Sequence, residues 1–189
     1  MQPSIKTCPC QVHPLFTSVS SALTYSNCCQ PYHDNFYQDG TDNSEGARAE
    51  SAERLMRTRY SAFVLVKADY IVATTVPAQQ ALLDIEAIES WAKQTDWAGL
   101  EIVRHTPKLG KRHAQVEFKA YFNTLDGTEQ KQQAHQELSA FVKIVDKPTN
   151  KNARWYFLDP TVAMTVSQKQ PCICESGEKF KRCCGVYLS

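Results

Sequence analysis

Apolar positions in residues 47–94 recur at helical spacing. A first helix is expected from Ala47 through Tyr60 and onward, with apolar side chains at Ala52, Leu55, Met56, Tyr60, Phe63 and Val66. A turn or short second helix is expected at Asp69–Ala73. Pro77 suits the first turn of another helix, whose apolar positions are Ala81, Leu82, Ile85, Ile88, Trp91 and Ala92. This half of the chain therefore predicts a helical layer with an apolar face.

Beyond residue 99 the period changes from helical spacing to alternation. Leu100–His105 is a predicted strand, and apolar residues alternate with polar ones along 114–122 and again at Leu138, Ala140, Val142 and Ile144. Such alternation is typical of half-buried antiparallel strands. Asp126-Gly127 predicts a hairpin turn, Lys147–Asn150 a second turn, and Arg154–Leu158 a last strand with Trp155 and Phe157 on one face. Helices followed by an antiparallel meander predict an α+β fold.

The chain has 189 residues, of which 42% are hydrophobic and 22% charged. This is enough for one globular domain of roughly 100–150 residues with appendages. A net charge of +1 gives no electrostatic indication of a nucleic-acid partner. Lys67 and Asp69 interrupt the most apolar stretch, so no membrane span is predicted. Because Met1–Cys10 lacks the apolar run of a signal peptide, we expect a cytoplasmic protein with reduced thiols.

Eight cysteines lie in two groups, and each group follows the pattern C-x-C, spacer, C-C. They are Cys8, Cys10, Cys28 and Cys29 near the start, and Cys172, Cys174, Cys183 and Cys184 near the end. Disulfides are disfavoured because adjacent cysteines and C-x-C neighbours pair poorly, and polar flanks argue against buried structural cysteines. The spacings usual for iron–sulfur clusters are absent. Four thiolates around one Zn²⁺ ion are the favoured interpretation, which predicts two zinc ions per chain.

Four protein ligands leave a zinc ion no open position, so both sites are predicted to be structural. Structural zinc contributes an apparent ~10–16 kcal/mol to the folding of small modules. We expect Lys179, Lys181 and Arg182 to offset the negative charge of four thiolates, and Gly177 to allow a tight turn. His13 and His33 are alternative ligands at the first site, although four cysteines already complete a tetrahedral shell.

The segment Pro171-Cys-Ile-Cys-Glu-Ser-Gly-Glu-Lys-Phe-Lys-Arg-Cys-Cys-Gly185 resembles the SEC-C motif, the zinc module at the C-terminus of the SecA translocation motor. Glu175 stands where that motif commonly has glycine. In SecA the motif contacts an export chaperone and the ribosome. The resemblance therefore implies a protein-binding role near protein synthesis, secretion or quality control.

The start of the chain resembles the YchJ-like family of small bacterial proteins, through Cys8-Pro-Cys10, Cys28-Cys-Gln-Pro-Tyr-His33, Ala52–Tyr60, Asp69-Tyr70 and Asp96–Leu100. The long spacer Gln11–Asn27 lacks the Ser-Gly element, and a polar stretch, Asp34–Gly46, precedes the first helix. The resemblance implies an N-terminal zinc module and linker at 1–46, a central domain at 47–162 and a C-terminal zinc module at 163–189. It also implies that the central domain adopts the cone-shaped nuclear transport factor 2-like (NTF2-like, cystatin-like) fold. Many proteins of that fold enclose a pocket or dimerise through the outer sheet face, so a homodimer is a further expectation.

Other candidate residues carry weaker hypotheses. Arg54, Arg57 and Arg59 with Tyr60 are a candidate anion-binding face. Because Arg57 and Arg59 point about 200° apart on a helix, we expect instead one solvated arginine and one paired with Asp69 or another carboxylate. Asp69 beside Tyr70 is either an acid/base pair at the mouth of the cone or a helix-end residue packed on its neighbour. His105, His113 and His135 are strand histidines, one of which would be functional only if it faced a pocket. The three tryptophans, Trp91, Trp97 and Trp155, are expected in the core.

Two functions remain as hypotheses. The first is a zinc-binding adaptor whose modules present surfaces to a protein partner. The alternative is an enzyme or small-molecule binder that uses the central pocket, which aromatic side chains filling the cone would exclude. The sequence contains no catalytic or phosphate-binding motif that favours an enzyme.

Overall fold

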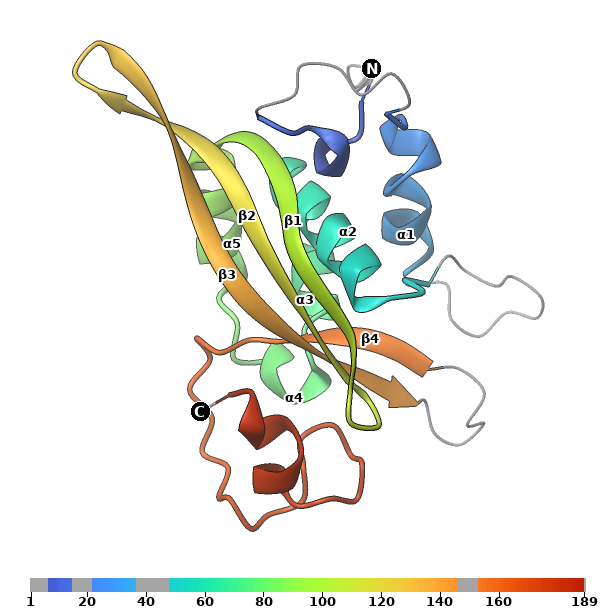
Figure 1. Cartoon of the computed structure of the whole chain (residues 1–189). Coiled ribbons are helices and arrows are strands. Elements are labelled where there is room, and N and C mark those ends of the chain that lie inside the picture. Colours follow the sequence, from blue (N-terminus) through green and yellow to red (C-terminus); the bar gives the residue numbers. More distant parts are fainter. Residues whose placement is uncertain (1–6, 15–21, 37–47, 146–152, 189) are drawn as a thin grey trace.

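The structure is a computed structural model that describes residues 7–14, 22–36, 48–145 and 153–188. Four antiparallel strands form one meander in the order β1-β2-β3-β4. Helices cover one face of this sheet, and the C-terminal segment lies beside the β4 end (Figure 1). The strands are β1 (Asp96–Leu109), β2 (His113–Asp126), β3 (Glu129–Val145) and β4 (Ala153–Leu158). The expected turn at Lys147–Asn150 lies outside the described residues.

The helices are short apart from two. They are α1 (Gln30–Asn35), α2 (Ala52–Val64), α3 (Ala68–Ala73), α4 (Pro77–Gln80) and α5 (Ile85–Gln94), with 3₁₀ turns η1 (Pro9–Gln11), η2 (Tyr25–Asn27), η3 (Phe180–Arg182) and η4 (Cys184–Val186). Helix α2 begins at Ala52 and not at Ala47, because the Ser51 side chain caps it by accepting a hydrogen bond from the backbone N–H of Arg54. The single helix expected after Pro77 is two helices, because Asp84 caps α5 in the same way, through the N–H of Ala87.

The inner face of the sheet packs against α2. Leu100, Val116 and Phe141 belong to one buried cluster with Leu55 and Tyr60. The hairpin predicted at Asp126-Gly127 is confirmed. Asp126 pairs with Glu129, and Gly127 has the positive φ angle, 63°, that this short loop requires. The α+β architecture is therefore confirmed, with α2 as the central helix.

The outer face of the sheet is also covered where β3 and β4 pair. Ala140, Val142, Tyr156 and Leu158 form a second buried cluster with the C-terminal cysteines and Phe180. The simple alternation expected for β3 is consequently wrong at Leu138, which is exposed, whereas Ser139 and Phe141 are buried. Residues 139–142 of β3 lie between the helices and the C-terminal segment, so both faces of the strand are buried there.

The tryptophans are not all in the core as expected. Trp97 and Trp155 are partly buried against the main cluster, but Trp91 is 50% exposed and Leu82 is 56% exposed. Trp91 contacts Phe63 and Trp97 edge-on, with ring centroids 5.1 and 5.0 Å apart. The apolar face of α5 therefore borders open space, and aromatic side chains do not fill it.

Candidate metal centres and an open pocket

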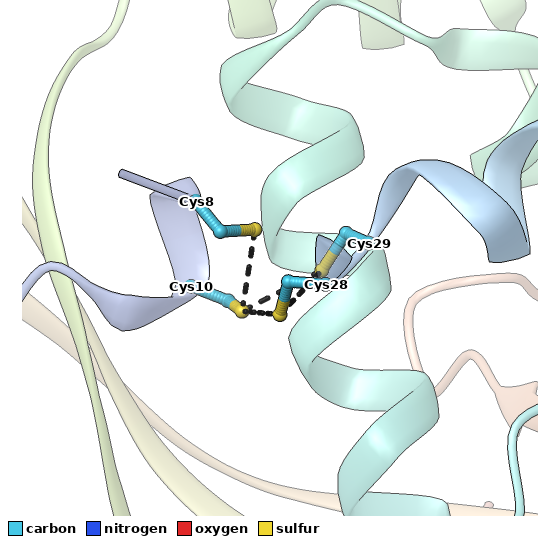
Figure 2. A group of neighbouring side chains, drawn as sticks. All are labelled: Cys8, Cys10, Cys28 and Cys29. Atoms are coloured by element: carbon cyan, nitrogen blue, oxygen red, sulfur yellow. Dashed lines mark hydrogen bonds between the residues drawn. The ribbon is translucent and has the colours of Figure 1, made fainter. Parts of the chain in front are cut away.

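The N-terminal cysteines converge from two turns of the chain. Cys8 and Cys10 flank the start of η1, and Cys28 and Cys29 immediately precede α1. Figure 2 shows their four side chains pointing toward one another beside α2. All four sulfurs lie within 4.8 Å of one another, and all four residues are buried.

The sulfur–sulfur distances at this site fit a tetrahedral metal ion. Cys10 Sγ lies 3.6 Å from Cys8 Sγ, 3.6 Å from Cys28 Sγ and 3.5 Å from Cys29 Sγ, and the sulfurs of Cys28 and Cys29 are 3.9 Å apart. Four Zn–S bonds of about 2.3 Å in a regular tetrahedron place the sulfurs about 3.8 Å apart. A disulfide would need about 2.05 Å, and all eight cysteines are free.

The electrostatics of this quartet also call for a cation. Thiol hydrogen bonds from Cys10 and Cys29 lower the pKa of Cys8, whereas hydrogen bonding to Cys10 and Cys8, together with burial, raises the pKa of Cys29. The thiols alone would thus share protons and would not ionise together. A divalent cation favours all four thiolates, so this donor set fits zinc.

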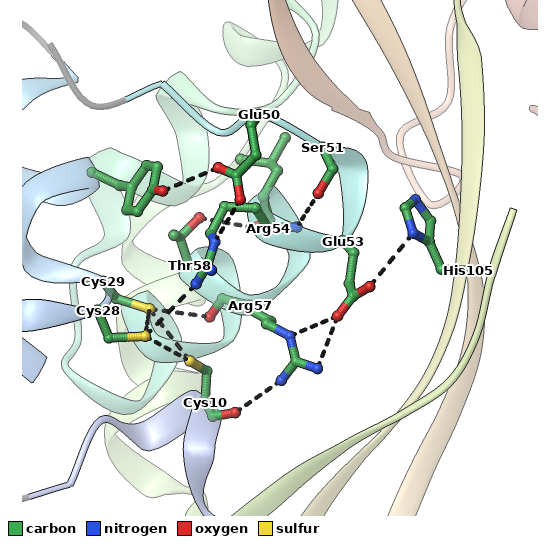
Figure 3. Close-up of polar contacts among 12 residues, drawn as sticks. Cys10, Cys28, Cys29, Glu50, Ser51, Glu53, Arg54, Arg57, Thr58 and His105 are labelled. Atoms are coloured by element: carbon green, nitrogen blue, oxygen red, sulfur yellow. Dashed lines mark hydrogen bonds and ion pairs between the residues drawn. The ribbon is translucent and has the colours of Figure 1, made fainter. Parts of the chain in front are cut away.

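Polar groups of α2 and the N-terminal segment contact the sulfurs from outside the quartet. Ser61 Oγ lies 3.3 Å from Cys29 Sγ, and Arg54 Nη1 donates to Cys28 Sγ at 3.7 Å. Figure 3 shows Arg54 between this sulfur and Glu50. Arg57 pairs with Glu53 at 2.9 Å and donates to the backbone oxygen of Cys10 at 3.2 Å. These contacts bind the module to α2 and would offset thiolate charge.

The alternative histidine ligands lie elsewhere. His33 is buried, with Nδ1 2.8 Å from Tyr25 Oη and Nε2 2.9 Å from the backbone oxygen of Thr58. Both of its ring nitrogens are therefore engaged. Among the described residues, His13 does not belong to the group of side chains that could hold a metal, which contains the four cysteines alone.

The C-terminal cysteines form a second quartet with the same geometry. Cys174 Sγ lies 3.6 Å from Cys172 Sγ and 3.5 Å from Cys183 Sγ, and all four sulfurs again lie within 4.8 Å of one another. The backbone N–H of Cys184 donates to Cys172 Sγ at 3.4 Å. His113 of β2 places Nε2 3.5 Å from Cys184 Sγ, so the quartet is bound to the sheet. This site also fits one zinc ion with no open position.

The turn between the paired cysteines shows why glycine is common there. Gly177 has a φ angle of +81°, as expected for a tight turn, and Glu175 has the left-handed value of +55°. Glu175 therefore adopts a conformation that disfavours side chains. Charge compensation by the nearby basic residues stays a prediction. Lys179, Lys181 and Arg182 are exposed, and within the described residues none donates a hydrogen bond to a sulfur.

The remaining candidates do not form a catalytic group. Asp69 is exposed, and Tyr70 points inward to donate to Thr58 Oγ1, so the helix-end alternative describes them and the acid/base pair is wrong. His105 lies 3.4 Å from Glu53. Of the three strand histidines, His135 lines the pocket described next.

A pocket of about 650 Å³ lies between the helices and the inner face of the sheet. Helices α2 and α5, the inner faces of β1–β3, and residues 159–163 after β4 contribute to its wall. Arg59 of α2 lines it as well, although this side chain is only 5% exposed. The expectation of a solvated arginine is thus wrong for Arg59. The pocket agrees with the expectation from the NTF2-like resemblance, whereas the periodicity of its apolar walls alone is the same as that of a filled core.

None of the helices in the described ranges has the length and apolarity that crossing a membrane requires. Together, the fold and the two quartets define a class of protein in which an NTF2-like domain carries a four-cysteine metal module at each end. Residues 51–160 match the YchJ middle NTF2-like domain, residues 2–37 the N-terminal zinc-binding domain of YchJ family proteins, and residues 169–185 the SEC-C motif.

Relatives along the full length agree with these matches. The chain is 45% identical over 181 residues to a UPF0225 protein of Actinobacillus succinogenes, covering 96% of this chain and 97% of that one. It is 67% identical to a SEC-C motif containing protein from Psychrobacter arcticus, whose crystal structure superposes with a TM-score of 0.88 over 99% of both chains. The solution structure of a SEC-C motif containing protein from Rhodopseudomonas palustris gives 32% identity and a TM-score of 0.56, covering 74% of this chain and 91% of that one. The chain belongs to the YchJ family (UPF0225).

Proposed function

We propose that this protein binds a small organic molecule in the pocket of its NTF2-like domain, and that its two zinc modules are structural braces for that domain. The open pocket carries the proposal. Its volume of about 650 Å³ is in the range that encloses a drug-sized ligand. Apolar walls with a few polar groups are typical of such sites.

The burial of the metal quartets supports the role of the modules as braces. The N-terminal cysteines belong to the same buried cluster as Leu55 and Met56 of α2. The C-terminal cysteines pack on Val142 and Leu158 of the sheet. The cysteines of each module are therefore buried against the central domain. In that position a bound metal ion would help to keep the pocket walls in place.

The test uses a neutral apolar dye, N-phenyl-1-naphthylamine, whose fluorescence rises in apolar surroundings. Zinc-loaded protein is expected to bind it saturably. Ala87 of α5 lines the pocket, whereas Ala81 is also exposed but lies outside the lining. An Ala87→Trp substitution should weaken binding at least tenfold by filling the pocket, and Ala81→Trp should not change it. Unsaturable binding, or equal effects of the two variants, would refute the proposal.

A second candidate function is that of an adaptor whose C-terminal module binds an acidic protein. The exposed basic residues Lys179, Lys181 and Arg182 favour it, because they place three positive charges within four positions of the chain. Reversing these three charges should remove a partner that the wild type retains. A control that reverses Lys93 and Lys131, exposed on α5 and β3, should retain that partner. A homodimer through the central domain also stays a prediction.

A further inference from the structure

Arg59 is a buried cation in the wall of the pocket. Its Nη1 donates to the backbone oxygen of Ile71 and to Thr74 Oγ1, both at 2.7 Å, and lies 3.3 Å from Thr75 Oγ1. The ring of Phe157 covers the guanidinium, with its centroid 4.4 Å from Cζ. These contacts fix the side chain in one position.

The other guanidinium nitrogens of Arg59 remain available. Within the described residues, no carboxylate lies within ion-pair distance of Arg59, and all of its hydrogen bonds come from Nη1. Nη2 and Nε make no hydrogen bond to the described residues, and neither atom is fully enclosed by protein. Both therefore reach accessible space. Because the residue is 5% exposed and lines the pocket, that space is the pocket.

An unpaired buried charge is unfavourable for a protein unless something compensates it. Burial lowers the pKa of Arg59 to about 10, so the group remains protonated at neutral pH. Asp159 and Glu137 act in the opposite direction from beyond direct contact. A bound anion would supply the missing partner through the fork of Nη2 and Nε, which suits a carboxylate.

Part of the pocket wall is apolar. Phe63, Ile88 and Trp91 belong to it, and the lining residues Trp91 and Leu82 are about half exposed. Glu137 and Asp159 also line the pocket, and their negative charges disfavour a ligand that carries more than one negative charge. The walls therefore fit a molecule with one anionic end and one apolar end.

We propose that the pocket binds an amphipathic organic monocarboxylate, with its carboxylate on Arg59 and its apolar body against Phe63, Ile88 and Trp91. This inference rests on the proposed function, because it specifies the ligand class of the same pocket. Two free donors of the guanidinium and the apolar part of the wall would together orient such a ligand.

The experiment measures displacement of the neutral dye by matched pairs of ligands. Decanoate is compared with decanol, and 4-phenylbutyrate with 4-phenylbutanol. The first pair has an alkyl chain and the second a phenyl group, so the two pairs also show which apolar group the pocket prefers. Each carboxylate is expected to displace the dye at a concentration at least tenfold lower than its alcohol. Decyl phosphate, with its higher charge, should displace it less well than decanoate.

Two variants test whether the preference for carboxylate depends on Arg59. In Arg59→Met the carboxylate should lose its advantage over the alcohol, and in Arg104→Met, a change on the exposed side of β1, it should keep it. If Arg59→Met does not fold, as judged by its zinc content and thermal unfolding, the wild-type comparison alone decides. Dye binding with no preference for carboxylate would overturn this inference and leave the pocket intact. No saturable dye binding would overturn the proposed function itself.

Discussion

Replacing Glu175 with glycine should strengthen zinc binding at the C-terminal quartet. Glu175 lies directly after Cys174 and has a φ angle of +55°. A side chain in the left-handed region costs about 1–2 kcal/mol. Glycine removes this cost, but roughly half of the stabilisation is lost again because glycine makes the unfolded chain more flexible. The expected net stabilisation is therefore about 1 kcal/mol.

This stabilisation should appear in the metal affinity, because zinc binding and folding of a small module are coupled. About 1 kcal/mol corresponds to a roughly fivefold higher zinc affinity. The backbone hydrogen bond from the N–H of Glu175 to the oxygen of Cys172, at 2.9 Å, is retained in the variant. The assay is competition with a chromogenic chelator, in which the N-terminal site serves as an internal reference.

Two control variants separate backbone conformation from side-chain contacts. Glu175→Ala removes the carboxylate and keeps a side chain at positive φ, so its affinity should stay within about twofold of the wild type. Gly177→Ala introduces strain at a φ angle of +81°, where a Cβ would meet nothing within 4 Å, and should lower the affinity roughly fivefold. If Glu175→Gly and Glu175→Ala bind zinc equally well, the conformational argument is wrong.

Further predictions concern the two modules. Cys10→Ser and Cys174→Ser should each reduce the zinc content from two to one per chain, measured by elemental analysis. Cys10→Ser should also accelerate hydrogen exchange in α2, because its quartet shares a buried cluster with Leu55, and unchanged zinc content in either variant would contradict the assignment. Gly99→Ala would place a Cβ 2.9 Å from the backbone oxygen of Val12 and 2.9 Å from Pro14 Cδ, at a φ angle of +148°. It should destabilise the protein by about 1–3 kcal/mol, lowering the melting temperature by at least ~2 °C. The control Gly110→Ala, with nothing within 4 Å, should lower the melting temperature less.

The elements with a local cause were predictable from the sequence. Alternation identified the strands, and the spacing of Cys172, Cys174, Cys183 and Cys184 identified the group of thiols that the structure gathers. The cysteines were predictable because metal-ligand spacing depends on a few neighbouring residues. The break between α4 and α5 was missed, since an aspartate cap at Asp84 is only one polar residue within an apolar pattern.

The pocket was expected only from the family resemblance, because its presence depends on tertiary structure. Trp91 and Ile88 have the spacing of core residues, but the periodicity of a helix does not show whether the facing space is filled. Arg59 is similar, because an arginine on a helix with polar neighbours usually faces solvent. Only the arrangement of α2, α3 and β4 encloses it.

The backbone after β4 serves two sites in succession. Residues 159–163 form part of the pocket wall, and the same chain continues into the C-terminal metal module. Ligand occupancy and metal occupancy would therefore act on one stretch of polypeptide. By thermodynamic reciprocity, whatever tightens this stretch from one side increases affinity on the other by the same factor. Removal of the C-terminal metal ion would then weaken binding of the proposed ligand.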